Sequence, residues 1–168
     1  MSLPSPWVVR FAPRIREGGS VLDLAAGGGR HTCHLLKLGL HVVAVDIDVS
    51  RLADLAASEE VEIVEADLEN ADWPFDGRTF DGIIVTNYLH RPLLALLVES
   101  LRPGGVMIYE TFAEGNEQHG RPRNPDFLLR EGELRNAFSA LTQIAYEHGY
   151  EERPQPAVRQ RICSVHRR

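Results

Sequence analysis

Cysteine is scarce in this chain, which has only 2 in 168 residues. Cys33 and Cys163 are far apart, so their spacing fits neither a metal site nor a disulfide framework. His31 and His34 flank Cys33, but no second cluster of matching spacing accompanies them, and we predict no metal site. Free thiols are typical of cytoplasmic proteins, and we expect this protein to be cytoplasmic.

Long apolar runs are also missing from the chain. No stretch approaches the roughly 20 residues that cross a bilayer. The first six residues lack the basic start and apolar core of a signal peptide, so we expect no membrane partner. A length of 168 residues with 43% hydrophobic content is ordinary for one globular domain, and we expect residues 1–168 to form a single domain.

Basic charge is sparse over most of the chain, and Lys37 is its only lysine. Residues 1–118 carry 9 basic and 18 acidic side chains, whereas residues 119–168 carry 9 basic and 6 acidic ones. The acidic part would repel a polyanion, so a nucleic acid is not an expected partner. The basic part leaves room for a local anionic contact, for example at Arg121 or Arg123, although exposed arginines are commonly just solvated.

Apolar runs alternate with helical patterns along most of the chain, which predicts a doubly wound α/β fold around a mostly parallel sheet. The expected parallel strands cover residues 20–24, 41–45, 61–65, 80–85 and 106–110. The expected helices cover residues 6–15, 30–38, 50–57, 92–101 and 130–138.

The C-terminal part departs from this alternation. Two further strands are expected over 141–148 and 157–165, and the link between them is too short for a helical crossover. They should therefore form an antiparallel hairpin, which makes seven strands with an antiparallel last one. The polar loop at 113–126 contains two glycines and two prolines, and loops of this length are commonly functional or mobile.

The most informative segment is the apolar run that ends in Asp23 and Leu24 and leads into the glycines at 27–29. A second apolar run ends in Asp46. Glycines allow a ligand to approach the backbone, and the start of the next helix exposes unpaired N–H groups. A carboxylate at the end of the second strand can accept hydrogen bonds from a ribose diol. Together these features predict a nucleoside-binding crevice at the carboxyl edge of the sheet.

Five segments, followed by the hairpin, resemble the motifs of class I S-adenosylmethionine-dependent methyltransferases and come in the same order. These segments lie at 23–29, 45–47, 65–68, 80–90 and 101–105. Ala25 stands where that family has its first loop glycine, which we expect to cost only the room of a methyl group. Glu110-Thr111-Phe112, followed by Gly115-Asn116, is similar in outline to small bacterial enzymes of the tellurite-resistance and thiopurine type. The resemblance implies the family's seven-stranded fold and S-adenosylmethionine as cofactor.

The resemblance also implies roles for individual residues. Asp46 would hold the ribose hydroxyls, Ile47 would pack on the adenine, and Asp67 would accept from the adenine amino group. Asp23 would contact the ammonium group of the methionine part. From the residues alone, the less favoured alternative for Asp23 is to cap a helix, and Asp67 could start a turn. The full predicted cofactor-binding set is Asp23, Ala25, Gly27, Gly29, Asp46, Ile47, Asp67, Leu68 and Asn87.

Three residues near the ends of the fourth and fifth strands are candidates for catalysis. His90 is the best candidate for a general base because a histidine titrates near neutral pH. An equally open alternative is that it merely starts a helix. Glu110 is a second candidate, for binding or for proton removal, and Tyr88 should face the pocket. His119, in the polar loop, is a weaker candidate.

The predicted function is methyl transfer from S-adenosylmethionine to a small molecule. A macromolecular methyltransferase acting on RNA or protein with a partner is the alternative, as is a catalytically silent cofactor-binding module. A homodimer mate or a partner protein could complete the cover above the pocket. An NAD-dependent oxidoreductase is disfavoured because Thr32 stands where its fingerprint has a third glycine, and because the last strand is antiparallel.

Overall fold

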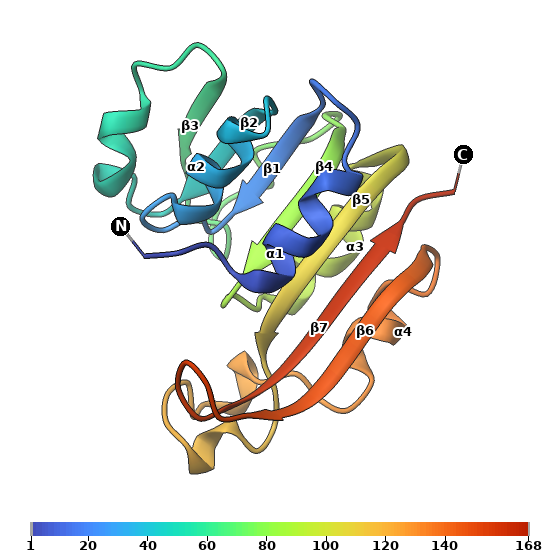
Figure 1. The fold of residues 1–168 in the computed structure, drawn as a ribbon. Helices are drawn as coiled ribbons and strands as arrows, with labels where there is room; N and C mark the ends of the chain where they lie inside the picture. The colour runs from blue at the N-terminus through green and yellow to red at the C-terminus, as the bar shows by residue number, and fades with distance from the viewer. Residues whose placement is uncertain (1, 168) are drawn as a thin grey trace.

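The computed structural model describes residues 2–167, which build one seven-stranded sheet (Figure 1). The strand order is β3-β2-β1-β4-β5-β7-β6, and β7 runs antiparallel to both of its neighbours while the other pairings are parallel. The predicted fold class is therefore confirmed. The strands are β1 (Ser20–Leu24), β2 (His41–Asp46), β3 (Val61–Glu65), β4 (Phe80–Thr86), β5 (Leu101–Phe112), β6 (Thr142–Glu151) and β7 (Ala157–Val165).

Short helices cover both faces of the sheet (Figure 1). Helices α1 and α2 lie on one face, and α3 and α4 lie on the other. Within the described residues, no helix has the length and apolar character that a membrane crossing requires. The α-helices are α1 (Pro6–Phe11), α2 (Arg30–Lys37), α3 (Leu94–Glu99) and α4 (Glu133–Ala137), and the 3₁₀ helices are η1 (Ala12–Arg14), η2 (Ser50–Leu55), η3 (Arg91–Leu93), η4 (Asn116–Gln118) and η5 (Pro125–Phe127).

Several expected helices differ from those observed. The helix expected at 6–15 is α1 followed by η1, and the helix expected at 130–138 is shortened to α4. The helix expected at 50–57 is the 3₁₀ helix η2, which buries only Leu52 and so has too little apolar face to stabilise a longer α-helix. The helix expected at 92–101 is divided into η3, which has Pro92 in its first turn, and α3. Leu101 already belongs to β5, where it pairs with Phe80.

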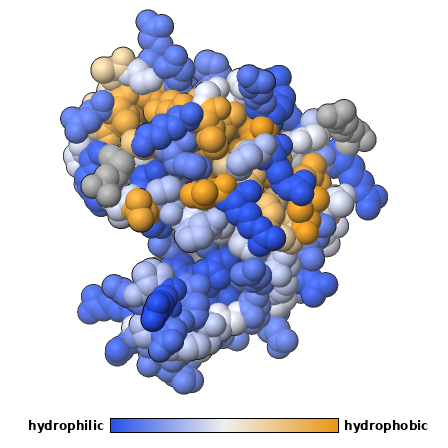
Figure 2. Space-filling view, viewed as in Figure 1, coloured by the Kyte–Doolittle hydropathy of each residue, from blue (hydrophilic) through white to orange (hydrophobic). Residues whose placement is uncertain are grey.

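The polar segment expected as a loop at 113–126 is tied into the fold. Ala113 forms a bridge with Leu129, and the Glu114 N–H donates to the Leu129 carbonyl at 2.9 Å. This segment and the end of the β6–β7 hairpin form a lower lobe that is largely hydrophilic at its surface (Figure 2). A notch separates that lobe from the rest of the molecule, on the side toward which β4 and β5 point.

Candidate functional site

The glycine loop after β1 turns sharply because three of its residues adopt left-handed backbone. The φ angles are +54° at Ala25, +56° at Gly27 and +75° at Gly29. A Cβ at Gly29 would lie 2.7 Å from the side chain of Leu52, so both conformation and space favour glycine there. The expectation that Ala25 costs only the room of a methyl group was incomplete. The cost of alanine at this position includes backbone strain, since left-handed backbone is unfavourable for residues with a Cβ.

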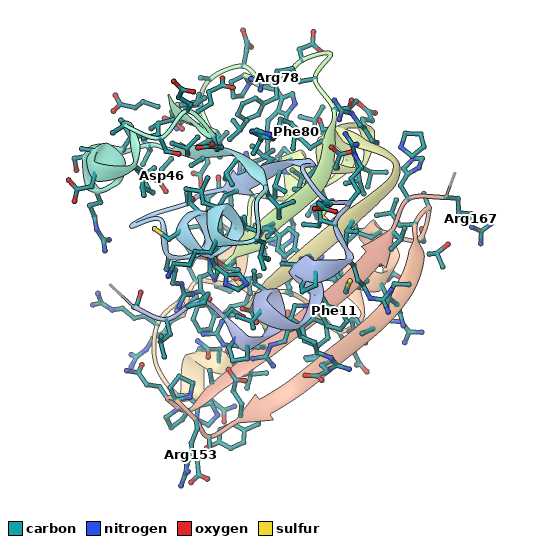
Figure 3. All side chains as sticks on the ribbon, turned by 45° about the horizontal axis from the view of Figure 1, so that its top comes forward. Phe11, Asp46, Arg78, Phe80, Arg153 and Arg167 are labelled. Carbon is teal, nitrogen blue, oxygen red and sulfur yellow. The ribbon has the colours of Figure 1, made fainter. Side chains whose placement is uncertain are left out.

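Asp46 joins the end of β2 to the glycine loop. Its Oδ2 accepts a hydrogen bond from the Gly27 N–H at 2.8 Å, and its Oδ1 accepts from the Asp48 N–H at 3.2 Å. A carboxylate oxygen can accept a second bond, so both oxygens keep capacity for a ligand. Figure 3 shows Asp46 where the chain passes from β2 toward η2.

A cleft of about 260 Å³ opens beside Asp46, and we call it the apolar cleft. It brings together predicted residues that are far apart in the sequence: Ala25, Asp46, Ile47, Asp67, Leu68 and Tyr88. The Asp67 carboxylate accepts hydrogen bonds from the Asn70 side-chain amide at 3.0 Å and from the Glu69 N–H at 3.0 Å. The bond from the Asn70 side chain lowers the pKa of Asp67, which is therefore ionised at neutral pH.

A second cleft of about 530 Å³, the polar cleft, lies on the other side of Ala25, which lines both. The glycine loop forms one wall, and the predicted residue Asn87 forms part of another. Arg30, His31, Arg51 and Thr86 also line it, and sequence reasoning missed them as site residues. Arg30 and His31 directly follow the glycines, which was a usable signal. No sequence signal pointed to Arg51. Only folding brings its guanidinium to 2.6 Å from the position that a Cβ of Gly28 would occupy.

His31 is a buried link between the N-terminal segment and the end of β4. Its Nε2 accepts from the Ser5 N–H at 3.0 Å, so the ring proton resides on Nδ1, which donates to Thr86 Oγ1 at 3.2 Å. Burial lowers the pKa of His31 to about 4. The ring is therefore neutral at neutral pH and links the Ser5 backbone to Thr86, which lines the polar cleft.

Asp23 is buried on β1, and neither Asp23 nor the loop residue Gly29 lines either of the two clefts. The Asp23 carboxylate is 1% exposed and accepts a hydrogen bond from Thr32 Oγ1 at 2.6 Å, which ties β1 to α2. Burial raises the pKa of Asp23 to about 6. In this structure the Asp23 side chain ties β1 to α2, and its contact with a ligand stays a prediction.

The three catalytic candidates do not converge on one place. Tyr88 lines the apolar cleft, and its O–H donates to Glu69 at 3.4 Å, while burial raises the pKa of its phenol. His90 precedes η3 and lines neither cleft. Glu110 is 4% exposed and accepts a hydrogen bond from Arg161 Nε at 2.8 Å. The Tyr88 phenol, whose pKa is raised, is a poor proton acceptor at neutral pH, and the Glu110 carboxylate is already paired with Arg161.

Solved structures share the fold across almost the whole chain. TehB from Haemophilus influenzae superposes with a TM-score of 0.81 at 20% identity, covering 99% of this chain and 64% of TehB. The 1,6-didemethyltoxoflavin-N1-methyltransferase of Burkholderia thailandensis, solved with 1,6-didemethyltoxoflavin and S-adenosylhomocysteine bound, superposes with a TM-score of 0.72 at 21% identity, covering 97% of this chain and 77% of that enzyme. At these identities the likeness establishes the fold alone.

Sequence comparison finds relatives of higher identity and a matching family model. The chain is 36% identical over 105 residues to the demethylmenaquinone methyltransferase of Clavibacter sepedonicus, a match that covers 57% of this chain. The same match covers 42% of that relative, so this chain corresponds to less than half of its length. The family model described as a methyltransferase domain matches residues 21–105, which include β1, the glycine loop, Asp46 and β4. The chain belongs to this methyltransferase-domain family.

Proposed function

We propose that this protein transfers a methyl group from S-adenosylmethionine to a small-molecule acceptor. The observation that carries the proposal is the pair of clefts that meet at Ala25. One is mainly apolar and is also lined by the carboxylates of Asp46, Asp67 and Glu69, and the other is polar and is lined by Arg30 and Arg51. S-adenosylmethionine has the same two-part character, with an adenosine at one end and a charged amino acid at the other. Membership of the methyltransferase-domain family supports the same cofactor.

The residues of the apolar cleft fit an adenosine group. Ile47 and Leu68 offer apolar surface for a flat base, and Tyr88 adds an aromatic ring. Asp46 would hold the ribose hydroxyls with the acceptor capacity that its two oxygens retain. Asp67, which is ionised, would accept from the exocyclic amino group of the adenine.

The polar cleft fits the methionine end of the cofactor. Arg30 and Arg51 line it beside Gly27 and Gly28, so a carboxylate would meet guanidinium groups and backbone N–H groups together. The absence of a side chain at Gly28 leaves the space that the Arg51 guanidinium occupies. We propose Arg51 as a cofactor-binding residue in addition to the set predicted from the sequence.

The chemistry requires little proton transfer from the protein. When bound, the sulfonium of the cofactor supplies an electrophilic methyl group and a good leaving group. The chain's own part is to orient the acceptor in line with that methyl group and to exclude water. A base is needed only for an acceptor that carries a proton on the attacking atom. The lack of a convergent set among Tyr88, His90 and Glu110 therefore agrees with an acceptor that reacts in its anionic form.

Relatives of known substrate support a small acceptor. By their names, the Clavibacter enzyme methylates demethylmenaquinone and the Burkholderia enzyme methylates 1,6-didemethyltoxoflavin, which are both small molecules. The proposal does not extend to either compound, since the matched parts cover the fold and the cofactor motifs.

Isothermal titration calorimetry tests the cofactor assignment. S-adenosylmethionine and S-adenosylhomocysteine should each bind at one site per chain, and NAD should not bind. A transfer assay with methyl-labelled S-adenosylmethionine then screens thiols, phenols and metalloid oxyanions. Failure of both sulfur compounds to bind would overturn the proposal, while tight binding without any transfer, including to cell extract, would favour the silent cofactor-binding module.

A further inference from the structure

A third cleft, of about 380 Å³, lies between the end of β5, the 113–126 segment and the start of β7. We call it the hairpin cleft. Its volume lies within the range of small-ligand sites, which is roughly 300–1,000 Å³. Phe112 and Pro156 give it flat apolar walls, and His119, Arg121 and Arg159 give it basic groups. None of these residues belongs to the apolar or the polar cleft.

Arg159 is held rigidly at the centre of this arrangement. Its guanidinium stacks over the Phe112 ring at 4.2 Å from the centroid, its Nε pairs with Glu151 at 2.7 Å, and its Nη1 donates to Asn87 Oδ1 at 2.6 Å. The side chain is 18% exposed. Among residues 2–167, Nη2 has no hydrogen-bond partner. A fixed guanidinium with an open N–H edge is well suited to bind a carboxylate or another planar anion.

The acidic groups nearest to the cleft are already paired. Arg161 donates to Glu110 at 2.8 Å and also pairs with Glu151. Arg121 forms no ion pair with any residue between 2 and 167. The lining therefore carries the charges of Arg121 and Arg159 against that of Glu151, and Glu151 is shared with Arg161. A bound anion would balance the excess positive charge.

The hairpin cleft adjoins the polar cleft through the Asn87–Arg159 hydrogen bond. Asn87 lines the polar cleft and Arg159 lines the hairpin cleft. Sheet register agrees with this, since Thr86 pairs with Glu110 on β5, and Phe112, two residues further on, pairs with Arg159 on β7. β4 and β7 are two strand spacings apart, roughly 10 Å, and the Asn87–Arg159 hydrogen bond spans this gap. A molecule in the hairpin cleft would therefore lie next to the methionine end of the cofactor.

We propose that the hairpin cleft is the acceptor site and that it selects a small, flat, unsaturated anion, with Arg159 binding the anionic group and Phe112 and Pro156 bounding the ring. This inference rests on the proposed function for its role in methyl transfer. The anion preference itself depends only on the cleft. Arg159 is a specificity-determining residue in this proposal, and Arg121 adds charge at the rim.

The test uses 1-naphthoate and its neutral analogue 1-naphthamide as probes, titrated into the protein with and without saturating S-adenosylhomocysteine. Ligand-detected NMR measures each affinity. Naphthoate should bind about tenfold more tightly than naphthamide, the difference expected for a hydrogen bond to a charged group. Arg159→Gln should abolish that preference, and Arg121→Gln should reduce it severalfold.

Arg123→Gln is the matched control, because it removes the same charge from the same segment at a residue that does not line the cleft. It should leave both affinities unchanged. Circular dichroism establishes that each variant is folded, and Arg121→Gln decides the matter if Arg159→Gln does not fold. Equal affinity for the two probes, or no binding of either, would overturn the anion site. If S-adenosylhomocysteine does not bind, the proposed function fails separately, and the titration without it still decides the anion preference.

Discussion

Left-handed backbone at two residues with side chains shapes the rims of the clefts. Ala25 and Asn87 both have φ of +54°. Asparagine tolerates this conformation better than alanine does, and the Asn87 N–H donates to the Glu110 carbonyl at 3.0 Å. Strain is accordingly concentrated at Ala25, the residue shared by the apolar and polar clefts.

Replacing Ala25 by glycine should raise the free energy of unfolding by about 1 kcal/mol, because the relief of left-handed strain exceeds the entropy that glycine adds to the unfolded chain. Gly27→Ala is the opposite experiment. Its φ is +56° and a Cβ there would meet nothing within 4 Å, so its cost is purely conformational. It should destabilise by about the same amount. Urea denaturation measures both, and a loss of stability in Ala25→Gly would show that the loop is not strained there.

Asp46 contributes both to the loop and to the proposed ribose contact. Asp46→Ala should weaken binding of S-adenosylhomocysteine by roughly 1–3 kcal/mol, since ribose hydroxyls and the Gly27 N–H would lose their acceptor. Asp48→Ala, whose carboxylate instead accepts from the Ser50 N–H at 2.9 Å, should change the affinity little. Calorimetry compares the two variants, and equal affinities for Asp46→Ala and the wild type would place the cofactor elsewhere.

At the scale of elements, β4 lies so close to the end of η1 that Gly82 has no room for a side chain. A Cβ at Gly82 would lie 2.5 Å from Ile15 Cδ1. Close packing at this point sets the distance between the N-terminal helical segment and the strand that ends at Thr86 and Asn87.

Gly82→Ala should destabilise the fold by about 1–3 kcal/mol through overpacking. Ile15→Val removes the atom that would clash, so the double variant should recover much of the loss. Gly120→Ala, where a Cβ would meet nothing within 4 Å, should have little effect on stability. Thermal unfolding of the four proteins provides the measurement. Absence of rescue in the double variant would mean that the strand cannot accept a Cβ for another reason.

Element prediction from the sequence succeeded where the signal was local. Glycine and proline punctuation and continuous apolar runs located all seven strands, and the short link before Ala157 predicted the antiparallel hairpin. The segment at 50–57 was wrongly expected as an α-helix, because its apolar periodicity did not reveal that only Leu52 would be buried. The amount of surface that a helix buries is a property of the packed molecule.

At the scale of the whole molecule, the buried groups Asp23 and His31 have opposite effects on how stability depends on pH. The pKa of Asp23 rises from 3.8 to about 6 on folding, so the folded state binds more protons and stability falls as pH rises through that interval. The pKa of His31 falls from 6.5 to about 4, so the unfolded state binds more protons and stability rises with pH over nearly the same interval. Each effect amounts to about 3 kcal/mol.

The wild-type protein should therefore show only a shallow dependence of stability on pH between 4 and 6.5, as far as these two groups are concerned. Asp23→Asn removes the compensating effect and should expose a steep loss of stability as pH falls through this interval. Urea denaturation at a series of pH values measures the slopes. A variant whose slope matches the wild type would show that the Asp23 carboxyl does not titrate in that range.

The sequence by itself determined the seven strands along the chain, the antiparallel hairpin and the glycine loop. It also placed the carboxylates of Asp46 and Asp67 together, because the carboxyl ends of parallel strands meet at one edge of a sheet. Only the tertiary structure decided that Asp23 and Glu110 are buried against Thr32 and Arg161 and line neither the apolar nor the polar cleft. It also brought Arg51 to Gly28 and Arg159 to Asn87, 72 residues apart. Contacts between such distant segments depend on packing across the sheet, and no local pattern of residues records them.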